Sequence, residues 1–241
     1  MDEPRPLDER GVTRRGSLLR LGGLAAGVVG AVGWAHERAE ASGRSGSGPA
    51  AVAAGLVTCV LSPEQTEGPF FTENDRIRRD VRDGRPGVPL SLRAGVLDVS
   101  TCKPIPGALV DIWHCDAGGT YSGFAQEGTA GARFLRGIQR TDRNGVAIFR
   151  TIYPGWYPGR TVHIHVRVYV GGDIVHTGQL YFPDALTDAV FRRVPYSRRP
   201  ARTTRNPSDA LYRNGGSRSL LKLTRNVTGY AARITMGVQL R

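Results

Sequence analysis

Nine consecutive residues, from Tyr157 to His165, hold a phenol, a guanidinium and two imidazoles. His163 and His165 are separated by one residue. Because side chains alternate along a strand, both imidazoles would point to the same side. β-branched neighbours such as Ile164 favour a strand here. Two imidazoles on one face suit a first-row transition metal, and a nearby tyrosinate oxygen favours a ferric ion. The alternative interpretation is a half-buried strand that carries two histidines without a metal.

Short alternating segments separated by turn residues predict a protein built mainly from strands. In chain order, the expected elements are a hairpin of 90–99 and 108–114, an Asn-Gly turn at 142–145 before a strand at 146–151, a hairpin of 162–170 and 174–182, a short helix within 185–194, and a closing strand at 231–240. No internal repeat interrupts this pattern. We therefore expect an all-β fold, a two-sheet β-sandwich with long active-site loops and little helix.

Composition bounds the class of protein. The chain has 241 residues, 40% hydrophobic and 22% charged, which fits one soluble globular domain of moderate size after a leader. The net charge of +12 predicts a positive surface field that would attract anionic compounds or polymers without identifying one. Six arginines fall within 192–205, where we expect a solvated loop, with binding of acidic substrates or anionic polymers as the alternative. Nucleic acid is not an expected partner, because this run lacks a repeated pattern of interleaved aromatic residues.

The first 41 residues have the features of an export leader. Residues 13–19 resemble a twin-arginine signal, and the apolar stretch 21–35 is short and glycine-rich. Residues 39–41 offer a small-x-small cleavage site, 42–55 have the composition of a flexible linker, and 56–241 are expected to form the folded domain. We therefore expect twin-arginine export to the extracellular space or cell envelope, with no stable membrane anchor after cleavage. An uncleaved membrane anchor is the alternative.

Three cysteines follow the leader, namely Cys59, Cys102 and Cys115. In an oxidising compartment, one disulfide and one free thiol form the simplest arrangement. Cys102 and Cys115 are expected at opposite ends of one strand, too far apart to bridge. The sequence therefore predicts a bridge from Cys59, with Cys115 slightly preferred as its partner. No CxxC pair and no cysteine–histidine spacing suggests zinc.

Four further segments stand out along the chain: DIWHCDAGGTYS at 111–122, FLRGIQRTD at 134–142, TIYPGWY at 151–157 and GQLYF at 178–182. In this order they resemble the signature of the intradiol ring-cleavage dioxygenase family, over about residues 59–185. The resemblance implies the same β-sandwich architecture that the strand pattern predicts. The compact, exported layout resembles a subgroup of that family associated with extracellular aromatic breakdown.

The resemblance implies one non-haem Fe(III) ion per chain, held by two tyrosines and two histidines. The matching positions are Tyr121, Tyr157, His163 and His165. A bound ion would lower the pKa of each ligating phenol. The resemblance also implies that a catechol-type substrate binds through both oxygens and displaces Tyr157. With O2, the ring would be opened to a cis,cis-muconate-type product, so the expected partners are a small aromatic diol and O2.

The same resemblance assigns further roles. Arg160 would stabilise negative charge that develops on the substrate, and Gln179 would lie near iron-bound solvent. The alternatives are a surface cation for Arg160 and an ordinary polar strand residue for Gln179. Pro69 and Phe70 match a segment at the mouth of the active site and would line the substrate pocket.

Three neighbouring residues are expected to be structural. His114 is predicted to be a hydrogen-bonded core histidine rather than a fifth ligand. Tyr153 and Tyr181 match no ligand position, so packing is the expected role.

The sequence also differs from some family members, and two other functional hypotheses compete with ring cleavage. We expect no room for the long N-terminal helical dimerisation region of the catechol-specific family members, so the oligomeric state stays open, as does the catechol derivative. The rival hypothesis is a non-catalytic exported β-sandwich binding module, which leaves the coincidence of four ligand residues unexplained. A metal-dependent hydrolase is a third hypothesis, which the tyrosines disfavour.

Overall fold

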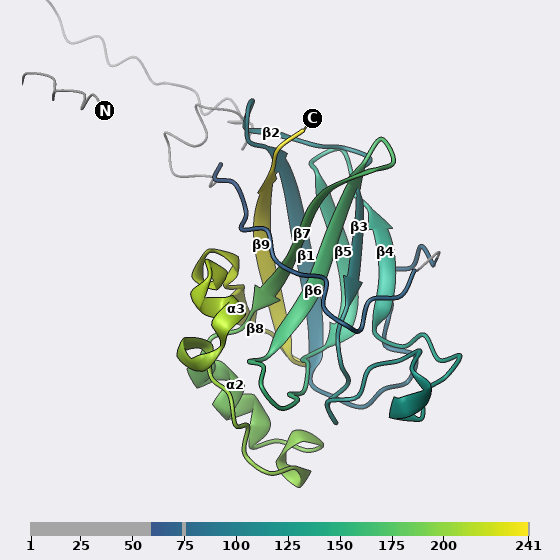
Figure 1. The fold of residues 1–241 in the computed structure, drawn as a ribbon, viewed down its shortest axis with the longest axis vertical. Helices are drawn as coiled ribbons and strands as arrows, with labels where there is room; N and C mark the ends of the chain where they lie inside the picture. The colour runs from purple at the N-terminus through teal and green to yellow at the C-terminus, as the bar shows by residue number, and fades with distance from the viewer. Residues whose placement is uncertain (1–58, 74–75, 241) are drawn as a thin grey trace, which may run out of the picture. The chain divides into compact units, whose positions relative to one another are not determined.

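The computed structural model describes residues 59–73 and 76–240. In this part of the chain, nine strands form two sheets that pack face to face (Figure 1). The strands are β1 (Pro89–Asp98), β2 (Lys103–Pro104), β3 (Leu109–Trp113), β4 (Arg136–Arg140), β5 (Val146–Ile152), β6 (His163–Val170), β7 (Asp173–Tyr181), β8 (Lys222–Arg225) and β9 (Tyr230–Val238). The predicted two-sheet β-sandwich is confirmed. The expected export leader at 1–41 and the linker at 42–55 lie outside the described residues.

The two sheets differ in topology. The first has the order β2-β1-β9-β8, with β5 also paired to β1. Within it, β1 and β9 run parallel, and the other pairs are antiparallel. The second sheet has the order β4-β3-β6-β7 and is antiparallel throughout. The parallel pair joins the first and last strands of the described chain, which ties its two ends into one sheet.

Alternating side chains fill the space between the sheets. β1 contributes Leu92 and Val96 to the core, and β6 contributes Ile164 and Val166 from the other side. Full burial of one such aliphatic side chain stabilises the fold by about 1.5–3 kcal/mol. Because successive residues of a strand face opposite sides, the odd-numbered residues of β6 face away from this core. The alternation therefore places His163 on the outer face of the second sheet.

Several predicted elements are confirmed. The hairpin of β6 and β7 is present, and β9 is the expected closing strand. The carboxylate of Asp142 accepts hydrogen bonds from the backbone N–H groups of Asn144 and Val146, and Gly145 has a φ of 70°. This left-handed turn, which glycine adopts without strain, leads into β5.

Helical segments are short and mostly follow the second sheet. They are η1 (Ala125–Glu127), α2 (Asp184–Phe191), η2 (Tyr196–Arg198), η3 (Asn206–Ser208), α3 (Ala210–Arg213) and η4 (Gly216–Ser219). The helix expected within 185–194 is therefore confirmed as α2. No helix of the described ranges is both long and apolar enough to span a membrane.

The arginine-rich run at 192–205 is not a fully solvated loop. Arg202 forms ion pairs with Asp184 at 2.5 Å and Asp188 at 2.8 Å, and Arg205 also pairs with Asp188. The guanidinium of Arg199 donates to the backbone carbonyl of Trp156 at 2.6 Å. The predicted solvated loop is wrong for Arg199 and Arg202, because the Trp156 loop and α2 supply acceptors for them. Arg205, in contrast, pairs with Asp188 and stays exposed as predicted.

The predicted hairpin of 90–99 with 108–114 is wrong. β1 and β3 belong to different sheets, and between them β2 folds back onto the end of β1. The alternation predicted correctly which side chains of each strand are buried. It does not predict whether two such strands pair within one sheet or face each other across the sandwich. The long connection at 100–107 permits the crossing from one sheet to the other.

The preferred disulfide is also wrong. Cys59 bonds to Cys102, with 5.5 Å between their Cα atoms, and Cys115 is free and buried. The backbone N–H of Ser62 donates to the carbonyl of Gly237, which lays the segment after Cys59 beside β9. This pairing brings Cys59 to the end of β1, where Cys102 lies, whereas Cys115 follows β3 in the other sheet. The expectation that Cys102 and Cys115 do not pair is confirmed.

Candidate metal centre

The outer face of β6 presents two buried histidines. In register, His165 lies opposite Trp113 of β3 and Gln179 of β7. The Trp113 indole stacks on the His165 ring, with 4.9 Å between centroids and 4° between planes. A Cβ added to Gly68 would lie 3.1 Å from His165 Cε1. The stacked indole and the close approach of Gly68 therefore restrict the position of this imidazole.

Two glycines hold together the loops that carry the tyrosines. Tyr121 lies in the loop after β3, and Tyr157 lies in the loop before β6. The backbone N–H groups of Gly119 and Gly155 both donate to the carbonyl of Asp116, at 2.9 and 3.0 Å. A Cβ on Gly119 would lie 2.2 Å from the Trp156 carbonyl, and one on Gly155 would lie 2.4 Å from the Asp116 carbonyl. Glycine at both positions thus lets the two loops pack back to back.

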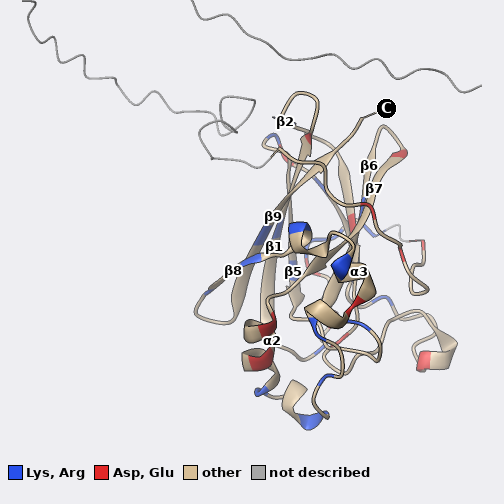
Figure 2. Ribbon diagram, turned by 60° about the vertical axis from the view of Figure 1, so that its left-hand side comes forward, with Lys and Arg blue, Asp and Glu red and all other residues tan. Residues whose placement is uncertain are grey.

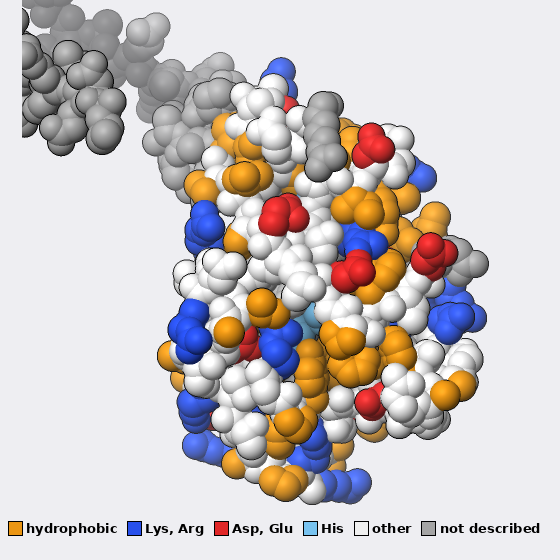
Figure 3. All heavy atoms as spheres, in the orientation of Figure 1, with side chains coloured by type: hydrophobic (Ala, Val, Ile, Leu, Met, Phe, Trp, Pro, Cys, Tyr) orange, Lys and Arg blue, Asp and Glu red, His pale blue; other side chains and the backbone are white. Residues whose placement is uncertain are grey.

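The four residues predicted as ligands converge. Tyr157 Oη lies 3.1 Å from His163 Nε2, and the Nε2 atoms of His163 and His165 are also 3.1 Å apart. The Tyr121 ring lies 5.7 Å from the Tyr157 ring and 6.1 Å from the His165 ring, between centroids. Figure 3 shows a pale blue histidine surface at the bottom of a small opening that hydrophobic side chains border. Within the cluster, Tyr157 is only partly buried, so the cluster meets the surface at this residue.

The histidines offer lone pairs to the centre of this cluster. His163 Nδ1 lies 2.6 Å from the carbonyl oxygen of Thr161, which can only accept, so Nδ1 carries the proton. The unprotonated Nε2 then faces the other three side chains. Burial, helped by Arg160, lowers the pKa of His163 to about 3, and burial lowers the pKa of His165 well below its usual value. Both imidazoles are neutral at neutral pH.

The tyrosines hold their protons without a cation. Burial raises the pKa of Tyr121 well above 10, and the neighbouring Tyr157 adds to the rise. Burial raises the pKa of Tyr157 to about 12, although Arg160 opposes it. The Tyr121 hydroxyl has no hydrogen-bond partner within the described residues. A buried hydroxyl without a partner costs about 1–3 kcal/mol, which points to a missing partner at this position.

This donor set fits a metal ion. Two neutral imidazole nitrogens and two phenol oxygens meet at one point, and one phenol lacks any other partner. A highly charged cation would supply that partner and favour ionised phenols, and anionic oxygen donors favour the higher oxidation state of iron. Across 59–73 and 76–240, no three His, Cys, Asp or Glu side chains gather to hold a metal, so tyrosine is essential to this centre.

Arg160 lies beside the cluster in a buried network. Its Nε donates to Asp209 Oδ2 at 2.9 Å, and its Nη2 donates to Gln179 Oε1 at 2.5 Å. The Tyr181 hydroxyl donates to the same Gln179 oxygen at 3.1 Å. Arg160 is therefore not a free surface cation, and Gln179 is not an ordinary polar strand residue.

Asp209 is a residue that sequence reasoning missed. It is buried, and it accepts the backbone N–H of Thr161 at 2.8 Å in addition to Arg160. It also caps α3 by accepting from the backbone of Leu211 and Tyr212. No motif surrounds it, and it lies 44 residues beyond His165 in the chain. An aspartate before a short helix is only a weak signal in the sequence. The role of Asp209 follows from its position beside Arg160 in the structure.

The segment 61–71 covers the cluster. Phe70 stacks on Tyr121, with 4.2 Å between centroids and 5° between planes, and meets Tyr157 edge to face at 5.7 Å. Gln179 Nε2 donates to the carbonyl of Thr66 at 3.0 Å, which anchors the segment to β7. Pro69 is exposed beside Phe70. The structure thus places both predicted pocket residues next to the cluster, with Phe70 in contact.

The residues expected to be structural are so. His114 Nδ1 and Nε2 lie 2.8 and 2.7 Å from the Cys115 carbonyl and the Thr151 hydroxyl, and burial lowers the pKa of His114 to about 4. The Tyr153 hydroxyl lies 2.8 Å from the hydroxyl of Thr187. Tyr181 is buried too, although its hydroxyl also joins the Gln179 network.

Arg136 is a second missed residue. It is buried, and its Nε and Nη2 donate to the backbone carbonyl of Ser122, directly after Tyr121. Its guanidinium also lies 6.0 Å from the centroid of the Tyr121 ring. Burial lowers the pKa of Arg136 to about 10. The arginine therefore anchors the loop that carries Tyr121.

Comparisons with known proteins place this arrangement in a family. The sequence model of a family described as Dioxygenase matches residues 62–194, more than half of the chain. An intradiol ring-cleavage dioxygenase from Tetranychus urticae is 35% identical, with a TM-score of 0.71, covering 75% of this chain and 95% of that chain. The dioxygenase domain of a dioxygenase–carbohydrate-binding protein fusion from Streptomyces sp. SirexAA-E is 32% identical, with a TM-score of 0.59 and coverage of 76% and 100%.

Curated relatives agree over a shorter stretch. Catechol 1,2-dioxygenase 1 from Acinetobacter lwoffii is 32% identical over 101 residues, which span 40% of this chain and 32% of the relative. The fold and the cluster define a β-sandwich with two histidines and two tyrosines at one point. The chain belongs to the intradiol ring-cleavage dioxygenase family, which is known for non-haem iron.

Proposed function

We propose that the chain is a non-haem Fe(III) intradiol dioxygenase that cleaves the ring of a catechol-type aromatic with O2. The proposed product is of the cis,cis-muconate type. The convergence of two imidazole nitrogens and two phenols carries the proposal, because the buried Tyr121 hydroxyl has no other partner. Relatives named for catechol, chlorocatechol and protocatechuate support a substrate of this class.

Tyr121, Tyr157, His163 and His165 would hold the iron. A ferric ion so held would bind the two catechol oxygens and draw electron density from the ring, which makes the ring reactive toward O2. Tyr121 is 1% exposed and enclosed by Phe70, whereas Tyr157 is only half-buried. Tyr157 is therefore the phenol that can move aside when a substrate enters.

Tyr157 would also accept a proton, and Arg160 would stabilise negative charge. Because the pKa of Tyr157 is about 12 without a cation, its released Oη would take up a proton given by a substrate hydroxyl. The cation of Arg160 opposes the rise in the pKa of Tyr157, so it would also act on a substrate oxygen bound beside Tyr157. There it would stabilise developing negative charge, and Gln179 would hold the guanidinium in place.

The visible absorption spectrum tests the proposal most directly. The iron-loaded chain is expected to show a tyrosinate-to-iron charge-transfer band that shifts when catechol is added without oxygen. Tyr157→Phe should change the band, while Tyr230→Phe, a tyrosine of the first sheet, should leave it unchanged. Under 18O2, both labelled atoms should enter the product. A chain that stays colourless after reconstitution would overturn the iron centre and favour the rival binding module.

We also propose that residues 1–41 direct export by the twin-arginine route and that the folded domain acts outside the cytoplasm. The arginine pair at 14–15 and the disulfide of Cys59 and Cys102 support this, because disulfides persist in oxidising compartments. Fractionation of cells that express the chain, with Arg14→Lys and Arg15→Lys as the comparison, tests it. Equal retention of both forms in the cytoplasm would contradict export.

A further inference from the structure

A row of cations crosses the outer face of the first sheet. Arg93 of β1 is in register with Arg233 of β9, which is in register with Lys222 of β8. The neighbours of these residues along each strand, such as Leu92 and Ala232, pack into the core, so the three exposed cations point outward. Neighbouring strands lie about 4.8 Å apart, so the row spans about 10 Å. Figure 2 shows blue segments on β8 and β9.

Sheet stability does not explain this row. Arg93, Lys222 and Arg233 form no ion pair and no side-chain hydrogen bond with any described residue. Like charges directly opposite each other on adjacent strands are destabilising. The arrangement therefore costs stability unless an anion covers it.

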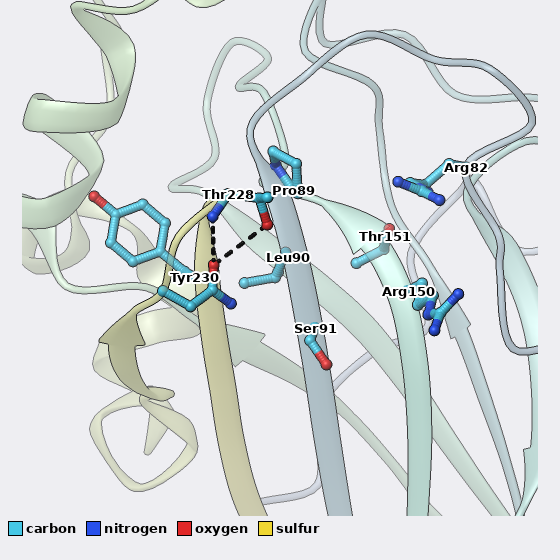
Figure 4. A pocket seen from close by; sticks show the side chains of 9 residues that line it. Arg82, Pro89, Leu90, Ser91, Arg150, Thr151, Thr228 and Tyr230 are labelled. Atoms are coloured by element: carbon cyan, nitrogen blue, oxygen red, sulfur yellow. Dashed lines mark hydrogen bonds between the residues drawn. The ribbon is translucent and has the colours of Figure 1, made fainter.

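A depression of about 270 Å³ adjoins the row. Ser91 lies two residues before Arg93 on the same face of β1, and its register partner on β5 is Arg150. Figure 4 shows Ser91 and Arg150 on neighbouring strands, and Arg82 also lines the depression. Arg82 is bound to Asp80 at 2.9 Å, whereas the exposed side chain of Arg150 makes no hydrogen bond within the described residues. The depression thus has at its edge a guanidinium that makes no hydrogen bond in the described part of the chain, although its charge also acts on the nearby Asp80.

Neutral hydrogen-bonding groups line the rest of the depression. Asn226 Oδ1 accepts the backbone N–H groups of Thr228 and Gly229, at 3.1 and 2.7 Å, which leaves its amide N–H groups to donate outward. The hydroxyls of Ser91 and Thr228 lie in the same lining. A guanidinium beside hydroxyl and amide groups matches the carboxylate and hydroxyls of an acidic sugar.

We infer that this basic face, defined as Arg93, Arg150, Lys222 and Arg233, binds a linear acidic polysaccharide that carries carboxylates at regular intervals. One uronate ring occupies the depression, and the following carboxylates meet the row. Tyr230 is the one aromatic residue in the lining of the depression, so this face lacks the series of aromatic platforms on which successive nucleic-acid bases stack. The inference goes beyond the proposed function and does not depend on iron.

The position of the basic face would allow it to bind a polymer while catalysis takes place on the outer face of the second sheet. The metal centre lies on the outer face of the second sheet, and the basic face lies on the outer face of the first. A polymer bound to the basic face therefore leaves the opening to the cluster free. The geometry allows an enzyme that stays on an acidic matrix without occupying its own active site.

Binding to polygalacturonate, measured by calorimetry with the intact chain, tests the inference. The triple variant Arg93→Gln, Lys222→Gln, Arg233→Gln is expected to bind at least about tenfold more weakly than the unaltered chain at low salt. A matched triple, Arg192→Gln, Arg193→Gln, Arg198→Gln, removes the same charge from exposed positions outside the face and should bind as the unaltered chain does. Binding should weaken as salt rises, because exposed charges are screened.

Several results would overturn the inference. Equal loss in both triples would show a net-charge effect, and loss confined to the matched triple would assign binding to the arginine-rich run at 192–205. Unchanged binding of the fully methyl-esterified polymer would exclude carboxylate recognition. Binding to anionic phospholipid vesicles without binding to polygalacturonate would assign the face to a lipid surface. Circular dichroism of each triple verifies that the fold is intact, so a loss of binding reports the face itself.

Discussion

Tyr121 and Tyr157 carry the same phenol in different surroundings. Tyr121 is enclosed by the stacked Phe70 ring, and its hydroxyl has no partner among the described residues. Tyr157 is half-buried and lies near His163 and the cation of Arg160. If the cluster holds iron as proposed, this contrast predicts that Tyr121 would be the fixed ligand and Tyr157 the exchangeable one.

Tyr121→Phe is expected to separate stability from iron binding. The substitution removes a buried hydroxyl without a partner, so the metal-free chain should be as stable as before or more stable by up to about 1 kcal/mol. Iron content after reconstitution should fall to near zero. As a matched control, Tyr153→Phe loses the hydrogen bond to Thr187, so it should destabilise by about 1 kcal/mol and keep iron. Urea unfolding and metal analysis check both, and full iron retention in Tyr121→Phe would contradict the assignment.

Asp209 joins a distant segment to the metal centre. Its carboxylate accepts from Arg160 and from the backbone of Thr161, two residues before His163. Hydrogen bonds from Thr161 and the charge of Arg160 hold the pKa of Asp209 below its usual value against the effect of burial. A depressed carboxylate pKa contributes stability above the unfolded value of about 3.9, and this contribution is lost as the pH falls.

Asp209→Asn is expected to lower turnover more than iron binding. Arg160 would lose its ion pair, so the guanidinium would no longer be held against the substrate position, and kcat should fall at least about tenfold with little change in KM. Asp188→Asn is the matched control, since Asp188 also pairs with arginine but lies in α2. Steady-state kinetics and the charge-transfer spectrum distinguish the two. Equal losses of kcat in both variants would show a general structural effect.

At the scale of elements, the segment 61–71 acts as a cover for β6 and β7. Glu67 forms an ion pair with Arg167, whose guanidinium lies 4.1 Å from the centroid of the Phe71 ring. Gln65 Nε2 donates to the carbonyl of Leu211 at 2.6 Å. These contacts join the cover to β6 and to α3, so the segment positions Phe70 over Tyr121.

Gly68→Ala is expected to disturb the metal centre through this cover. Gly68 has a φ of 71°, and its added Cβ would lie 3.1 Å from His165 Cε1. Gly128→Ala is the matched control, because Gly128 has a φ of 68° with no atom within 4 Å. Both should lose about 1 kcal/mol of stability from the left-handed backbone. Gly68→Ala alone should weaken iron affinity and shift the charge-transfer band; an unchanged band would refute the contact.

At the scale of the whole molecule, three of the four histidines that are buried in the described residues make stability depend on pH. Burial lowers the pKa of His114 to about 4, that of His163 to about 3, and that of His165 well below its usual value. The unfolded chain binds these protons near pH 6.5, so their contribution to stability is full above that pH. It is lost as the pH falls from 6.5 toward the folded values.

The metal-free chain should therefore lose stability between pH 6.5 and 4.5. Each histidine contributes up to about 1.4 kcal/mol per pH unit in this window. Most carboxylates titrate below about pH 5, so the part of the window between pH 6.5 and 5 reports mainly the histidines. Urea unfolding at half-unit pH steps measures the slope, and a flat profile between pH 6.5 and 5 would contradict the assignment of neutral buried histidines.

The sequence alone determined what depends on local pattern. Alternation identified β6, the pairing of β6 with β7, and the common side of His163 and His165, because these follow from the geometry of one strand and one tight turn. The resemblance of four motifs located both tyrosines. The tertiary structure brought the four residues together as expected.

What the tertiary structure decided concerns partners far apart in the chain. β1 and β3 share a buried core yet lie in different sheets, and this separation places Cys102, rather than Cys115, beside Cys59. Asp209 and the cation row likewise arise from contacts or strand registers that no local pattern encodes. The physical reason is that alternation specifies which side of a strand is buried, whereas the strand's neighbours depend on how the whole chain packs.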